Sequence, residues 1–443
     1  MTVAGRLAAG FLLVLFFVVE ISLAQEQQNP TEPPPAQSPP PEELLQQANA
    51  ALQQEDYATA SAVLESYLAQ EPEDYRAKFN LALAFSMTGR QGDAIRLYRE
   101  ILVQQAELVP ARVNLGILLL QQGNAAEALQ EFELVVAQQP DHWAAQVNRA
   151  GALLALHRNS EAAQAYQRAL QLNRDHAPTH LAYGKVLATL DPAAAEPPLR
   201  RALELDPSLE ETKLVLAGVL VDRAAQGADT LTEAVSLYRE MLGDHPDHTE
   251  LRLRLADIFL SQQRLPEAIQ ELEVARAATP ADAELNRALL EVYLQAKEHA
   301  KAQSLLPDVL AQDPGDANLH MLQGSLLMEQ RQYPAAAEAF RRAIELAPRQ
   351  AQGYSNLASA LYLMKDYEGT IRALEDVAAL GKDTAGSYFV RAITLDRLGL
   401  KDAAYDNYQK FLATDEQKNP DQEFQARQRL IVLERELKRS PRR

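Results

Sequence analysis

The sequence predicts an all-α fold in which about eleven similar helix pairs stack side by side. Three observations carry this prediction: a 34-residue spacing that recurs along most of the 443 residues, helical spacing of apolar residues within each repeat, and prolines at a fixed place. The composition agrees, because Ala, Leu, Gln and Glu favour helices and aromatic residues make up only 6% of the chain. One such pair cannot bury its own apolar faces, so stacking is required.

An alanine followed four residues later by an aromatic residue or leucine marks each repeat, with one threonine replacing the alanine. Successive markers are 34, 34, 34, 33, 39, 34, 34, 34, 34 and 34 residues apart. A proline, which cannot continue a helix, often stands twelve residues after the small residue. The pairs are Ala60/Leu64, Ala94/Tyr98, Ala128/Phe132, Ala162/Tyr166, Ala195/Leu199, Ala234/Tyr238, Ala268/Leu272, Ala302/Leu306, Ala336/Phe340, Thr370/Leu374 and Ala404/Tyr408.

Each repeat contains two helical patterns, seen clearly between residues 113 and 138. The first helix ends at Gly123 and Asn124, a typical helix stop. The second helix starts at Ala125, and its apolar residues have the period of a helix rather than of a strand. The small residues Gly116 and Ala128 let the two helices approach closely, so we expect a large side chain such as Phe132 to fill the space between neighbouring pairs.

The N-terminal 41 residues do not fit the repeat pattern. Residues 1–24 resemble a secretory signal peptide, with Arg6 before an apolar stretch from Leu7 to Val19 and small residues at Ser22 and Ala24. Cleavage there predicts a protein outside the cytoplasm, periplasmic or secreted; the alternative is an uncleaved signal anchor that tethers it to the membrane. Residues 25–41 are rich in Pro and Gln and predict a disordered tether.

The period breaks once, which divides the array. One repeat lacks a residue and carries Pro192, Pro197 and Pro198 at the start of its second helix, and the next has five extra residues around 224–230. Because interior prolines shorten or kink helices, we expect an irregular joint over 191–232 between a first lobe at 42–190 (repeats one to five) and a second at 233–418 (repeats six to eleven). The alternative is a local bend without mobility. Residues 419–443 predict a capping helix and a basic tail.

The small residue, the aromatic residue, the terminal proline and the Asn114-Leu115-Gly116 triplet together resemble the tetratricopeptide repeat. The resemblance covers about residues 41–418. It implies a right-handed superhelical α-solenoid, and it implies that the first helices line a concave groove in which protein partners lie.

The net charge, the absence of cysteine and the missing motifs argue against several classes of function. A net charge of −18 argues against nucleic-acid binding, and the absence of cysteine excludes thiolate chemistry and cysteine metal sites. We found no glycine-rich phosphate loop, no GxSxG and no HExxH motif. The histidine pairs His176/His180 and His245/His248 are read as solvated rather than as metal ligands. We therefore expect no enzyme activity, no catalytic or metal residues and no small-molecule cofactor.

Helical geometry assigns positions 2, 5, 6, 9 and 12 of each repeat, counted from residues 75, 109, 143 and so on, to one side of the first helix. Asparagine stands at position 6 in three consecutive repeats. The resemblance implies that such asparagines can hold the backbone of an extended peptide; the alternative is that they bond a neighbouring repeat. The residues predicted to line the groove are Asn80, Asn114, Asn148, Phe79, Leu83, Val113, Ile117, Val147 and Leu181, although the aliphatic ones could instead pack against adjacent helices.

The same side of the later repeats is more polar, with Glu211, Glu250, Asp257, Glu284 and Glu291, and then Met321, Met328, Tyr362 and Phe389. The expected function is a non-catalytic, extracytoplasmic scaffold that binds a protein or an extended peptide, in envelope assembly, secretion or polysaccharide export. The alternatives are an accessory subunit of a separate envelope enzyme and a stand-alone enzyme. Membrane contact is expected only through an uncleaved signal anchor.

Overall fold

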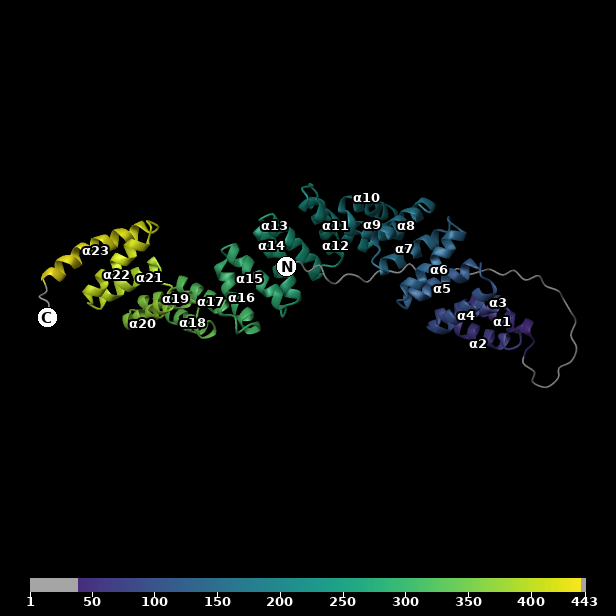
Figure 1. Cartoon of the computed structure of the whole chain (residues 1–443), viewed down its shortest axis with the longest axis horizontal. Helices are drawn as coiled ribbons and strands as arrows, with labels where there is room; N and C mark the ends of the chain where they lie inside the picture. Colours follow the sequence, from purple (N-terminus) through teal and green to yellow (C-terminus); the bar gives the residue numbers. More distant parts are fainter. Residues whose placement is uncertain (1–38, 440–443) are drawn as a thin grey trace. The chain divides into compact units, whose positions relative to one another are not determined.

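The computed structural model describes residues 39–439, which form 23 helices and no strand (Figure 1). The chain divides into two compact units, unit 1 ending at Asp244 and unit 2 beginning at His245. The predicted signal peptide and nearly all of the predicted tether lie outside the described residues.

Unit 1 contains twelve helices in six consecutive pairs. They are α1 (Pro41–Gln53), α2 (Tyr57–Leu68), α3 (Tyr75–Met87), α4 (Gln91–Gln104), α5 (Val109–Gln121), α6 (Ala125–Gln138), α7 (Trp143–Ala155), α8 (Asn159–Leu172), α9 (Ala177–Leu190), α10 (Pro192–Leu205), α11 (Glu210–Ala225) and α12 (Leu231–Asp244).

Unit 2 contains five further pairs and one last helix. They are α13 (Thr249–Ser261), α14 (Leu265–Ala278), α15 (Ala283–Gln295), α16 (His299–Gln312), α17 (Ala317–Glu329), α18 (Tyr333–Leu346), α19 (Ala351–Leu363), α20 (Tyr367–Ala379), α21 (Ala385–Arg397), α22 (Lys401–Thr414) and α23 (Pro420–Arg439).

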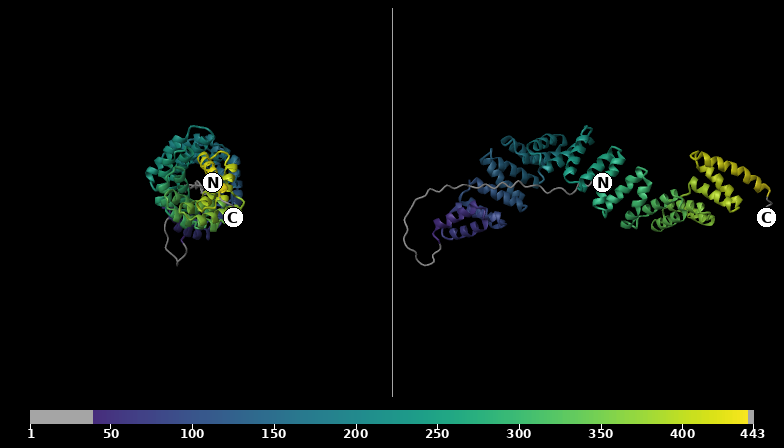
Figure 2. Two further views of the ribbon diagram at one scale, coloured as in Figure 1. Left: turned by 90° about the vertical axis from the view of Figure 1, so that its left-hand side faces the viewer. Right: turned by 180° about the vertical axis from the view of Figure 1, so that it is seen from behind.

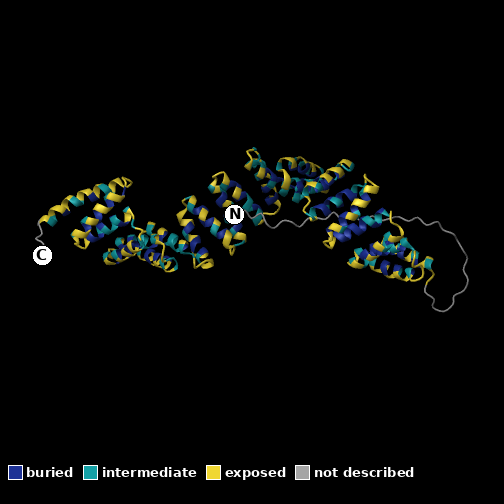
Figure 3. Ribbon diagram, viewed as in Figure 1, coloured by how far each residue is buried: buried dark blue, intermediate teal, exposed yellow. Residues whose placement is uncertain are grey.

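The all-α prediction of eleven stacked pairs and a capping helix is confirmed. Within each unit consecutive helices pack on one another (Figure 2), and buried residues lie between them while exposed residues lie at turns and outer faces (Figure 3). Every marker residue of the repeat, the ten alanines and Thr370, is fully buried.

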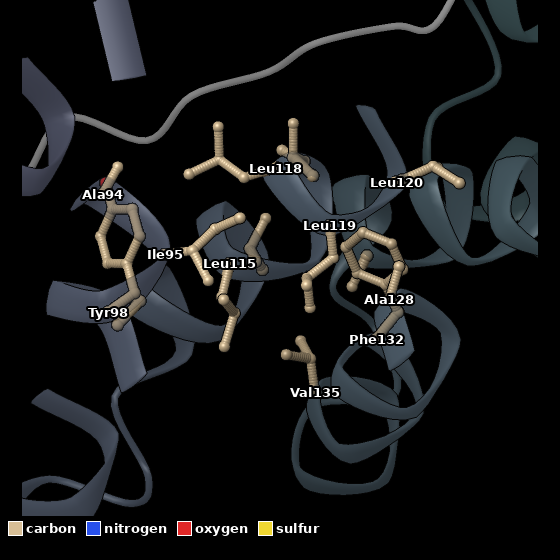
Figure 4. Packing of buried hydrophobic residues seen from close by; sticks show 14 of the residues in the cluster. Ala94, Ile95, Tyr98, Leu115, Leu118, Leu119, Leu120, Ala128, Phe132 and Val135 are labelled. Carbon is tan, nitrogen blue, oxygen red and sulfur yellow. The ribbon is translucent and has the colours of Figure 1, made fainter. Parts of the chain in front are cut away.

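The predicted close approach of the paired helices is also present. A Cβ added to Gly116 would lie 2.6 Å from Cε1 of Phe132, and Phe132 is fully buried beside Leu119 and Val135 (Figure 4). The glycine is therefore needed for space, because any side chain there would collide with the aromatic ring of the second helix.

The turn inside ten of the eleven pairs has one shape that glycine fits best; the turn between α9 and α10 differs, with Asp191 at φ −155°. In the ten turns the chain adopts a positive φ, as at Gly123 (φ 82°), where the N–H of the next residue, Asn124, donates to the carbonyl of Leu119 at 2.8 Å. This is the helix-end arrangement that closes a helix with a left-handed residue. Six repeats place a non-glycine residue at this point, namely Glu55, His157, Gln263, Lys297, Arg331 and Lys365.

A polar side chain at position 4 of the first helix holds the loop before it in seven repeats. Each bonds the carbonyl oxygen six residues earlier, and thereby satisfies a backbone acceptor that the loop leaves without a helical partner. The pairs are Arg112 with Ala106, Gln146 with Pro140, His180 with Arg174, Arg252 with Pro246, Asn286 with Pro280, His320 with Pro314 and Tyr354 with Pro348.

The proline-rich second helix of repeat five is continuous. α10 has 14 residues, as do α4, α6 and α8, and it contains Pro197 and Pro198 in its interior. Three of the extra residues of repeat six lengthen α11 to 16 residues, and Thr230 Oγ1 closes the loop after it by donating to Leu220 O at 2.5 Å. The lobe boundaries predicted from the sequence stay a prediction; the division into compact units falls between Asp244 and His245.

Candidate functional site

We call the residues at positions 2, 5, 6, 9 and 12 of the first helices the first-helix face. In unit 1 the structure buries its predicted apolar members Phe79, Leu83, Val113, Ile117, Val147 and Leu181. Asn114 and Asn148 are also buried, and of the nine predicted residues only Asn80 is half-buried. Asn114 and Asn148, which the sequence predicts to line the groove, therefore lie in the core, because neighbouring repeats pack over these positions. The role of the nine residues in binding stays a prediction.

Asn114 bonds the neighbouring repeat. Its Nδ2 donates to the hydroxyl oxygen of Tyr98 in α4 at 3.1 Å, and both side chains are fully buried. Burial raises the pKa of the Tyr98 hydroxyl well above its ordinary value, so the group stays neutral. Asn114 Oδ1 is buried without a hydrogen-bond partner among the described residues. An unsatisfied buried acceptor of this kind costs about 1–3 kcal/mol.

The other two asparagines have different surroundings. Asn148 Nδ2 donates to Ala144 O at 2.9 Å, one turn earlier in its own helix α7. Asn80, in α3, keeps part of its side chain accessible. The three residues thus share a repeat position but do not share one bonding pattern, which sequence spacing could not distinguish.

The reachable part of the face in unit 1 includes half-buried residues on α3, α7, α9 and α11. Asn80 is joined there by Gly151, Leu154 and Ala182. Lys185, at position 9 of α9, bonds Glu211 of α11 through Nζ and Oε1 at 2.5 Å. This surface combines small, apolar and amide groups, which suits contact with a peptide main chain.

The corresponding face of unit 2 is acidic at its start. Asp257, Glu284 and Glu291 are exposed, and Glu250 bonds Arg254 at 3.0 Å. The protein atoms around the exposed Asp257 carboxyl partly desolvate it and raise its pKa, and the nearby Glu250 raises the pKa further. Further along, Met321, Met328 and Tyr362 are half-buried, whereas Phe389 is buried beside Tyr408.

His176 and His180 stabilise the start of α9 by hydrogen bonds. His176 caps α9, because its Nδ1 accepts the N–H of Thr179 at 3.2 Å, and His180 bonds the loop carbonyl of Arg174 at 2.9 Å. His248 directly precedes α13. Within residues 39–439 no group of three or more His, Cys, Asp or Glu side chains could hold a metal ion. Within the same range no helix is both long and apolar enough to cross a membrane.

The repeats described above match models of a known repeat family. Two models, each described as tetratricopeptide repeat, match the chain, one at residues 225–290 and the other at 45–109, 113–177, 287–351 and 321–387. No curated protein matches the sequence.

Solved structures match as well. MamA from Desulfovibrio magneticus is 19% identical, with 38% of this chain and 96% of that one covered and a TM-score of 0.37. A thermophilic protein of Thermus thermophilus is 25% identical, covering 42% and 99% at a TM-score of 0.32. Yeast Tom70 is 12% identical, covering 90% and 96% at a TM-score of 0.32.

Proposed function

Since the chain belongs to the tetratricopeptide repeat family, whose members generally mediate protein–protein interactions and are generally non-catalytic, we propose that it is an interaction scaffold outside the cytoplasm. It binds an extended segment of a partner protein along the first-helix face of unit 1, in envelope assembly, secretion or polysaccharide export. The signal-like residues Leu7–Val19 and Ser22–Ala24 support the location.

The observation that carries the binding site is the half-buried amide of Asn80, which stays partly accessible at position 6 of α3. A side-chain amide can donate to and accept from a peptide main chain, which every partner segment offers regardless of its sequence. Gly151 and Leu154 of α7 are half-buried on the same side of their helix. A segment that crosses from α3 to α7 therefore contacts Asn80 and these two residues.

A photoreactive residue in place of Asn80 tests the site in producing cells. We expect it to cross-link a partner protein, whereas the same residue at Val103, which is 86% exposed on α4, should not. Replacing Asn80, Asn114 and Asn148 together by Ala should weaken the purified complex by up to about a hundredfold, at about 1 kcal/mol per hydrogen bond.

Two measurements keep the result interpretable. Urea denaturation followed by the fluorescence of Trp143, the single tryptophan, verifies that the triple variant still folds. Mass spectrometry of the mature N-terminus tests the predicted cleavage after Ala24. Unchanged affinity of a folded triple variant would eliminate the asparagine site, and an intact N-terminus in the cytoplasmic fraction would eliminate the location.

A further inference from the structure

Two neighbouring first helices of unit 1 begin with a histidine cap. His142 Nδ1 accepts the N–H of Ala145 at the start of α7 at 3.1 Å, and His176 Nδ1 accepts the N–H of Thr179 at the start of α9 at 3.2 Å. An imidazole nitrogen can accept such a bond only while it carries no proton. The caps of α3, α15 and α17 are carboxylates instead, from Asp74, Asp282 and Asp316.

Trp143 connects the two histidine caps. It directly follows His142 as the first residue of α7, and its ring lies edge-on against the ring of His176. The ring centres are 4.8 Å apart and the ring planes make an angle of 66°. Trp143 and both histidines are half-buried. A displacement of the first turn of α7 therefore removes a packing contact from the cap of α9.

The charged groups around the two histidines leave burial as the main influence on them. The aspartate before each histidine is bound by an arginine of the second helix of the same pair, namely Asp141 by Arg168 at 2.6 Å and Asp175 by Arg201 at 2.7 Å. Burial lowers the pKa of His142 and of His176, and repulsion from the nearby His180 lowers the pKa of His176 further. Both caps are therefore neutral near pH 7 and take up protons in mild acid.

We propose that the starts of α7 and α9 form one acid-sensitive element, which is closed while His142 and His176 are neutral and opens when they are protonated. Protonation removes the acceptor for the backbone N–H, and it places a positive charge at the positive end of a helix dipole. A histidine whose pKa is lowered in the closed state gives stability above its free pKa of about 6.5, and this stability is lost as the pH falls toward the closed-state value. The element should therefore open between about pH 6.5 and 5.

The element belongs to the helices that carry much of the reachable first-helix face. Gly151 and Leu154 stand on α7, and Ala182 and Lys185 stand on α9. Opening of these two helix starts gives the protein a means to weaken partner binding in acid. This consequence rests on the proposed function, whereas the element itself is a property of the unbound chain.

Hydrogen exchange of the purified protein at pH 7 and pH 5, measured by mass spectrometry, tests the element without a partner. After correction for the intrinsic pH dependence of exchange, the protection of peptides covering residues 142–149 and 176–183 should fall by about fivefold, the loss expected of a helix cap. The start of α3 is the internal control, because its cap, Asp74, is a carboxylate, and carboxylates are ordinarily ionised throughout this range. Its protection should stay within about twofold.

Asparagine is the diagnostic replacement, because it caps helices well and does not titrate. His142→Asn should keep the start of α7 protected at pH 5, and His176→Asn should do the same for α9. Each single variant should also reduce the loss at the other helix, because Trp143 then keeps its contact, and the double variant should remove both losses.

His248→Asn is the matched control variant. His248 also follows an aspartate and directly precedes a first helix, α13, but its side chain makes no cap bond. Its replacement should leave the losses at α7 and α9 unchanged.

Three results would overturn the proposal. The first is a loss of protection at α7 and α9 no larger than that at α3, and the second is a double variant that loses as much protection as the wild type. The third is a pair of single variants that each act only on their own helix, because the two caps would then be separate. A partner complex that is unaffected by the opening would count instead against the binding site proposed above.

Discussion

Replacing Gly116 by alanine isolates the close approach of the two helices of a pair. Alanine in the interior of a helix normally stabilises it by about 1 kcal/mol relative to glycine. At Gly116, however, the new Cβ would lie 2.6 and 2.7 Å from Cε1 and Cζ of the buried Phe132. Overpacking of this kind costs about 1–3 kcal/mol. We therefore expect Gly116→Ala to lower the free energy of unfolding by about 0–2 kcal/mol, as the sum of these two opposing effects.

Gly151 is the control, because it also lies in the interior of a first helix, α7, one position after the place that corresponds to Gly116. A Cβ there would meet only Cδ2 of Leu120, at an ordinary contact distance of 3.6 Å. Gly151→Ala should therefore gain up to about 1 kcal/mol, so the two variants should differ by about 1–3 kcal/mol. Urea denaturation followed by Trp143 fluorescence measures this difference in unit 1, and the thermal midpoint should shift by about 2–4 °C per kcal/mol.

A second substitution tests the cause. Phe132→Leu alone creates a cavity and destabilises the protein, but in combination with Gly116→Ala it removes the atoms that collide with the new Cβ. The double variant should thus be more stable than the sum of the single changes by about 1 kcal/mol. If Gly116→Ala and Gly151→Ala stabilise the protein equally, the steric explanation is refuted.

Two further predictions concern stability. Arg331 adopts φ 60° at the turn of its repeat, so Arg331→Gly should stabilise unit 2 by about 0.5–1 kcal/mol. Gln330→Gly is the control, because Gln330 has φ −82° and should gain no stability from glycine. Thermal unfolding followed by circular dichroism compares the two variants, and equal effects would contradict the backbone explanation. Burial, with a contribution from His180, lowers the pKa of His176, whose neutral Nδ1 caps α9. A histidine with a lowered pKa in the folded state contributes stability above its unfolded pKa of about 6.5 that is lost as the pH falls through the folded value. The free energy of unfolding of unit 1 should therefore fall by up to about 1 kcal/mol between about pH 7 and 5. In the His176→Asn variant, asparagine caps the helix without titrating, so urea titrations at the two pH values should show a smaller loss. An identical pH dependence in both proteins would exclude His176 as the cause.

The repeat architecture could be read from the sequence because each signal is local. The markers, the helix stops and the position of Gly116 beside Phe132 follow from the spacing of small, aromatic and proline residues within about 34 positions. α10 differs from the expectation, since it accommodates Pro197 and Pro198 without ending. There the packing of α10 against its neighbours outweighs the hydrogen bonds that the prolines cannot make.

By itself the sequence determined the helix pairs, their number, the residues between them and the side of each first helix on which Asn80, Asn114 and Asn148 stand. Only the tertiary structure decided that Asn80 is accessible while Asn114 and Asn148 are buried, and that Phe424 and Ile431 are exposed. The physical reason is that helical periodicity assigns a residue to a face. Whether that face reaches water depends on how closely the neighbouring helices pack over it.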